Sequence, residues 1–79
     1  MPRFPRDAPR GRVIRALAAL GFHLVRQANH ISMRRENPDG SVTTLTLPGH
    51  PKIKASTLRT VCAQSGIARG DFLGAYILS

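Results

Sequence analysis

The stretch "VRQANHISMRRENPDGSVTTLTLP", residues 25–48, decides the fold because its apolar side chains recur at every second position. Ile31 and Met33 share one parity, and polar residues occupy the positions between and beside them. A period of two is that of a β-strand with one buried face and one open face. His30 begins this strand on the open face, and its position there raises the question of its function.

The strand at residues 30–36 is flanked by two further strands, at residues 22–27 and 41–48. On each strand the apolar residues share one parity and are expected to face a core: Phe22 and Leu24, Ile31 and Met33, Leu45 and Leu47. The second and third strands are joined by "NPDG", in which Pro38 fixes φ and Gly40 accepts a positive φ. The sequence therefore predicts a three-stranded antiparallel meander.

Helical periodicity surrounds these strands, with segments at residues 10–21, 55–66 and 68–78. The apolar residues of these segments recur three or four positions apart: Val13, Ile14, Leu17 and Leu20; Leu58, Val61 and Cys62; Phe72, Leu73, Tyr76 and Ile77. The order α-β-β-β-α-α predicts an α+β fold in which the helices cover one face of the sheet and leave the other open. We expect residues 1–9 to be a loose basic arm and residues 10–79 to form a single domain.

The composition points to a polyanionic partner. The 79 residues carry twelve Lys and Arg against four acids, a net charge of +8, and ten of the cations are arginine. Such an excess favours nucleic acid, and the planar guanidinium suits phosphate. Cys62 is the one cysteine, so no internal disulfide can form and a cytoplasmic location is expected. Neither a membrane-spanning run nor the apolar core of a signal peptide is present.

Several classes of enzyme lack the residues they need. Four scattered acids do not make a two-metal nuclease site, and no Cys/His set has zinc spacing. No cofactor is therefore expected. A histidine among arginines remains, and it suffices for RNA cleavage, because the 2′-hydroxyl of RNA is itself the nucleophile and an imidazole exchanges protons near neutral pH.

The residues alone leave two interpretations of His30 open: a solvated hairpin residue, or a group that moves a proton. The cations divide in a similar way, because Arg12 and Arg15 fit the solvated face of the first helix. Four others gather on the open sheet face and its adjoining basic loop, where they would bind RNA phosphates: Arg26, Arg34, Lys52 and Lys54. Ser32 shares that face. His23 is interpreted as structural or neutral. His50, in the loop, is a second candidate for phosphate contact, although solvation of the loop explains it better.

Three segments, "RALAALGFHLVRQANHISMRR", "TLTLPGHPKIKASTLRTV" and "AQSGIARGDFL", together resemble the HicA-type toxins, small mRNA interferases of bacterial toxin–antitoxin pairs. The resemblance extends over nearly the whole chain. It implies a fold like that of a double-stranded-RNA-binding domain, metal-independent cleavage of mRNA by one histidine, and neutralisation by a HicB-type antitoxin that covers the site.

The resemblance places the catalytic role on His30. The family's Gly-Ser-His motif is changed here, because Ala28 and Asn29 precede the histidine. Asn29 tolerates the left-handed conformation that a tight turn can require. The serine hydroxyl is lost, and any phosphate contact that it made must come from Asn29 or is absent. Two alternatives to an RNA-cleaving toxin are a non-catalytic RNA-binding module and an inactive toxin that only binds its antitoxin.

Overall fold

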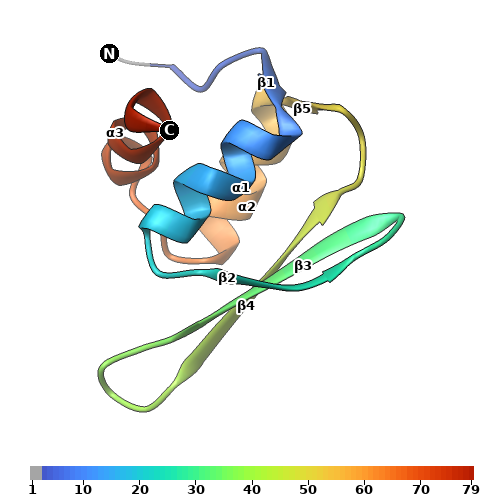
Figure 1. The fold of residues 1–79 in the computed structure, drawn as a ribbon. Helices are drawn as coiled ribbons and strands as arrows, with labels where there is room; N and C mark the ends of the chain where they lie inside the picture. The colour runs from blue at the N-terminus through green and yellow to red at the C-terminus, as the bar shows by residue number, and fades with distance from the viewer. Residues whose placement is uncertain (1–2) are drawn as a thin grey trace.

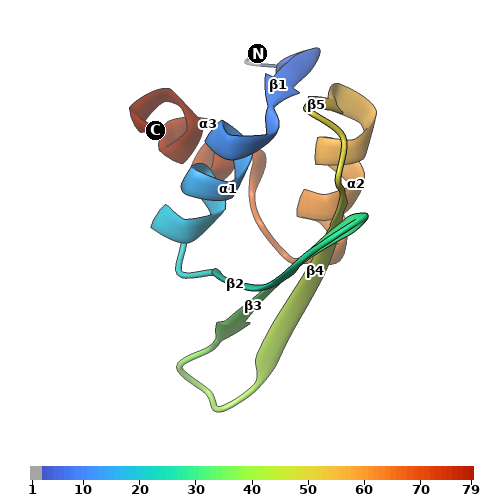
Figure 2. The ribbon, with the colours of Figure 1, turned by 45° about the vertical axis from the view of Figure 1, so that its right-hand side comes forward.

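The computed structural model describes residues 3–79 and has the predicted α+β architecture. In chain order the elements are β1 (Asp7–Pro9), α1 (Arg10–Ala19), β2 (His23–Gln27), β3 (His30–Glu36), β4 (Val42–Pro48), β5 (Lys52–Lys54), α2 (Ala55–Gln64) and α3 (Arg69–Leu78). The helices lie on one side of the antiparallel sheet β2-β3-β4 (Figures 1 and 2). This arrangement confirms the predicted meander and is consistent with a fold like that of a double-stranded-RNA-binding domain.

The strand register explains why one face of the sheet is buried. Ile31 lies opposite Leu47 and Met33 opposite Leu45, and all four side chains are 5% exposed or less. Side chains that face each other across an antiparallel pair lie on the same face. The alternation in the sequence therefore predicted the core face of β3 and β4 correctly.

β2 departs from that pattern. All five of its residues are exposed, and the expectation that Leu24 faces the core is wrong, because its side chain is 45% exposed. Leu24 does pair with Met33, but a bulge follows between Leu24 and Arg26 at this edge of the sheet. Parity predicts the face of a residue, not whether another element covers that face. Of the two residues of this segment that were predicted to face the core, only Phe22, just before the strand, is buried.

Two glycines have the backbone conformation that their turns require. Gly21 follows the end of α1 with φ +96°, and Gly40 closes the β3–β4 turn with φ +89°, where side chains are disfavoured. In the same turn, Ser41 donates two hydrogen bonds to the Asp39 carboxylate, through its backbone N–H and its hydroxyl. These bonds lower the pKa of Asp39.

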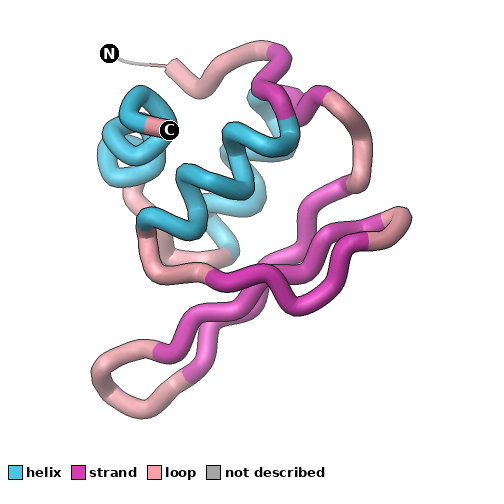
Figure 3. Tube along the Cα trace, viewed as in Figure 1, coloured by secondary structure: helices cyan, strands magenta, loops and turns pink. Residues whose placement is uncertain are grey.

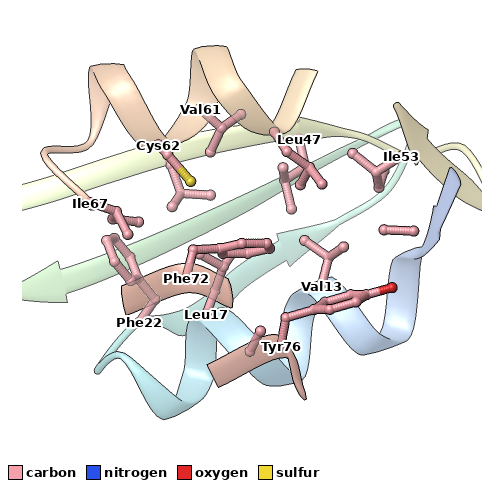
Figure 4. Packing of buried hydrophobic residues seen from close by; sticks show 14 of the residues in the cluster. Val13, Leu17, Phe22, Leu47, Ile53, Val61, Cys62, Ile67, Phe72 and Tyr76 are labelled. Atoms are coloured by element: carbon pink, nitrogen blue, oxygen red, sulfur yellow. The ribbon is translucent and has the colours of Figure 1, made fainter. Parts of the chain in front are cut away.

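The core lies between the sheet and the helices (Figure 4). Phe72 of α3 is fully buried and Leu17 of α1 nearly so, and the Phe72 ring packs 5.9 Å from that of Tyr76. Cys62 of α2 is buried among them, and burial raises the pKa of its thiol to about 11. The thiol is therefore protonated at neutral pH and packs as an apolar group.

Two arginines join elements together. The Arg12 guanidinium lies 4.0 Å from the centre of the Tyr76 ring and donates from Nε to the Tyr76 carbonyl at 3.1 Å, so it ties α1 to α3. The expectation that Arg12 is merely solvated is wrong. The Arg35 guanidinium carbon lies 4.6 Å from the centre of the Phe22 ring, and Nη1 of the same side chain donates to the Leu20 carbonyl. Both cations stabilise the fold through their planar faces.

The loose arm was predicted over residues 1–9, of which 1 and 2 lie outside the described residues. Residues 3–9 differ from that expectation. Residues 7–9 form β1, which pairs antiparallel with β5, and Ala8 and Ile53 are fully buried in this small sheet. Phe4 is 9% exposed, and its ring lies 5.9 Å from that of Phe72. A three-residue strand that contains a proline has no periodicity for sequence analysis to detect.

This packing predicts a stability effect. Phe4→Ala is expected to lower the free energy of unfolding by about 3 kcal/mol, because it leaves a cavity beside Phe72. Arg3→Ala, at an exposed neighbour, is expected to change it by less than about 0.5 kcal/mol. Urea denaturation of both variants measures the difference. Equal stability of the two variants would mean that the arm is loose.

Candidate functional site

The open face of the sheet carries most of the predicted site. His30 lies opposite Pro48 of β4, and Ser32 lies opposite Arg26 of β2. Arg34, two positions further along β3, is also exposed on this face. Because the helices cover only the other face (Figure 2), these side chains are accessible to a large ligand.

Near the β2–β3 turn this face is hollowed. The depression, here called the His30 hollow, has a volume of about 290 Å³ and is lined by Arg26, Ala28, Asn29, His30 and Ser32. Four of the predicted site residues thus meet around one space. A guanidinium, an amide and a hydroxyl can all donate hydrogen bonds to an anion held there.

The remaining three predicted residues lie outside this hollow. Arg34 is further along the same face. Lys52 and Lys54 lie on β5, not in a loop as expected, and they line a second hollow of about 650 Å³ with Pro48 and His50. Since Pro48 also lies opposite His30, the two hollows are neighbours. An extended ligand that fills the first hollow can therefore reach the second over Pro48.

A close backbone contact positions the turn before His30. The Gly49 N–H donates to the Asn29 carbonyl at 2.9 Å. A Cβ at position 49 would lie 2.6 Å from the Asn29 oxygen and 2.9 Å from the Ala28 oxygen. Only glycine allows this approach. Figure 3 shows the β2–β3 turn and the loop after β4 at the same end of the sheet.

Arg10 also binds the loop that contains Gly49. Its Nη1 donates to the Gly49 carbonyl at 2.7 Å, and its backbone N–H donates to the Pro51 carbonyl at 2.9 Å. Asn29 achieves its turn without a left-handed conformation, because among residues 3–79 only glycines have a positive φ. The turn therefore depends on these contacts rather than on the conformational tolerance of Asn29.

Of the residues that line the His30 hollow, only His30 has a side chain of the kind that commonly serves as a general acid or base. Elsewhere in residues 3–79 no three His, Cys, Asp or Glu side chains are grouped closely enough to hold a metal ion. No helix in that range is long and apolar enough to cross a membrane. The hollow can thus transfer a proton and bind an anion.

Comparison with protein families gives a match over residues 11–67 to the HicA toxin of bacterial toxin–antitoxin systems. The chain belongs to the HicA toxin family. It is therefore the toxin of a toxin–antitoxin pair, and an antitoxin is its partner. Comparisons with curated proteins and with solved structures give no match.

Sequence reasoning missed two parts of this toxin's site. Gly49 has its role because of a contact between residues twenty positions apart, which no local pattern indicates. Pro48 was assigned only to the end of a strand. The sequence did contain a signal for Pro48. Alternation along β4 places this residue on the open face with Thr44 and Thr46.

The contact at Gly49 generates a prediction. Gly49→Ala is expected to lower the free energy of unfolding by about 1–3 kcal/mol, since two backbone oxygens must move away from the new methyl group. It is also expected to shift the NMR signals of the His30 ring. The matched control is Gly74→Ala in α3, where nothing lies within 4 Å of the added Cβ.

Gly74→Ala is expected to stabilise the toxin by roughly 0.5–1 kcal/mol, because alanine is the better helix former. Urea denaturation and NMR spectra of both variants test the pair. A Gly49→Ala protein with unchanged stability and an unchanged His30 signal would contradict the proposed role of this contact.

Proposed function

We propose that this toxin is a metal-independent endoribonuclease that cleaves mRNA, with His30 as the general base. The observation that carries the proposal is the position of His30: exposed, on the helix-free face, in a hollow that also contains Arg26, Asn29 and Ser32. The family supports the same activity. A HicB-type antitoxin would inhibit the toxin by covering this face.

The chemistry needs few groups from the protein. His30 takes the proton of the 2′-hydroxyl, and the 2′-oxygen attacks the adjacent phosphorus. The bond from phosphorus to the 5′-oxygen breaks, and that oxygen takes up a proton from water. The products are a 2′,3′-cyclic phosphate and a free 5′-hydroxyl. His30 then returns its proton to solvent.

The other residues of the hollow would stabilise the negative charge of the transition state. The phosphorane carries more negative charge than the phosphodiester, and the Arg26 guanidinium offers two parallel donors to its oxygens. The Asn29 amide and the Ser32 hydroxyl add neutral donors. Arg34 on the sheet face and the Lys52–Lys54 hollow would hold the phosphates on either side of the cleaved one.

The reaction can be tested with one RNA and a few variants. The toxin is expected to cleave single-stranded RNA in the presence of EDTA and to leave 2′,3′-cyclic phosphate ends. It should spare a substrate with a 2′-deoxy sugar at the cleavage position, because the nucleophile is then missing. His30→Ala is expected to lower the rate by about 10²–10⁴-fold, the usual contribution of a positioned acid or base.

The matched control is His23→Ala, since His23 is exposed on the same face, opposite Arg34, but does not line the hollow. It should cleave at the wild-type rate, and both variants should keep wild-type stability to within about 0.5 kcal/mol. Loss of activity on chelation, or cleavage of the deoxy substrate, contradicts the mechanism. RNA binding without cleavage by the wild-type toxin would instead indicate the non-catalytic module.

A further inference from the structure

A second basic surface lies on the helical side of the molecule. A groove of about 620 Å³, here called the arginine groove, is lined by Arg3, Phe4, Arg6, Ala55, Arg59 and Arg69. None of these residues is acidic, and none belongs to the three-stranded sheet. The N-terminal arm that forms one wall runs on the side of the helices away from that sheet (Figures 1 and 2).

The fold brings the four guanidinium groups together from three separate segments. Arg3 and Arg6 flank Phe4, which anchors the arm against Phe72. Arg59 projects from the outer side of α2, next to the buried Leu58. Arg69 is the first residue of α3. Like charges gathered without an intervening acid repel one another, and an anion in the groove removes that cost.

The groove continues into an apolar hollow of about 240 Å³. This extension shares Phe4, Arg59 and Arg69 with the arginine groove and adds Cys62, Ala63 and Ile67. A ligand that fills both spaces therefore has carboxylate or phosphate groups directly beside a small apolar group.

These features favour a peptide over RNA. The single aromatic ring in the groove, Phe4, is 9% exposed, so it offers no open face on which a base can stack. Carboxylates match the guanidinium forks in pairs, and an aliphatic side chain fits the extension. We propose that the arginine groove binds an acidic peptide segment with an apolar side chain beside its carboxylates, supplied by the antitoxin that the family membership implies.

The proposal does not depend on RNA cleavage. The arginine groove and the His30 hollow share no residue. One antitoxin chain that occupies the groove and also covers the sheet face would gain affinity from the effective concentration of its second contact. The groove would then hold the antitoxin on the toxin from the side away from the RNA.

The first test measures fluorescence anisotropy with a labelled peptide of alternating Glu and Leu. The wild-type toxin should bind it, and should bind a Gln–Leu peptide or an all-Glu peptide of the same length more weakly. Arg59→Glu should weaken binding by at least about tenfold, since charge-assisted hydrogen bonds are lost. The control Arg15→Glu makes the same charge change on the exposed face of α1 and should have a much smaller effect.

A second variant separates this proposal from general attraction to anions. Ala63→Arg adds a positive charge but fills the apolar extension, so it should weaken binding of the Glu–Leu peptide. If it strengthens binding instead, the extension is not used and the proposal is wrong. Equal losses for Arg59→Glu and Arg15→Glu also overturn it.

RNA provides the last comparison. Arg59→Glu and Arg15→Glu should bind a 2′-O-methyl RNA equally and cleave a normal RNA at equal rates. A specific loss of RNA binding in Arg59→Glu would make the groove a phosphate site and would refute the peptide proposal. His30→Ala should bind the Glu–Leu peptide as the wild-type toxin does, so failure of the proposed cleavage and failure of this proposal are seen separately.

Discussion

The approach of Gly49 to the backbone of the β2–β3 turn is the constraint on which the site depends. Its N–H binds the Asn29 carbonyl, and a Cβ there would come within 2.6 Å of the same oxygen. Arg10 binds the Gly49 carbonyl and so connects this loop to the start of α1. His30 follows the turn directly. Backbone contacts therefore set its position, and its side chain remains exposed.

The two faces of the sheet differ because successive side chains of a β-strand point to opposite sides. One face of β3 and β4 buries Ile31, Met33, Leu45 and Leu47 under the helices, which stabilises a small domain with a limited core. No helix packs on the other face, so it can carry polar side chains. This division explains how a 79-residue chain can keep a histidine exposed without cost to its fold.

The sequence predicted the elements that have a clear period. The parity of β3 and β4 was sufficient to identify both the core face and the open face. The arm and β5 were missed, because their strands have three residues each and are held by a pairing between distant segments. Leu24 was misplaced because periodicity does not show where a covering helix ends. Gly49 and the arginine groove depend on tertiary contacts that local patterns do not contain.

Net charge alone was also a coarse guide to function. Of the twelve cations, Arg12 and Arg35 pack on aromatic rings and Arg10 binds backbone carbonyls. The free cations divide between the sheet side and the helical side. The excess charge of the sequence is thus distributed over two separate surfaces, for which we propose RNA and an acidic peptide as the ligands.

The most direct test of the central claim is a structure of the toxin with an RNA that carries one 2′-methoxy group at the cleavage position, which prevents reaction. We expect the phosphate next to that group to occupy the His30 hollow, about 3 Å from the Arg26 guanidinium and next to the His30 ring. The neighbouring phosphates should lie near Arg34 and Lys52. An RNA bound on the helical side, with an empty His30 hollow, would contradict the account.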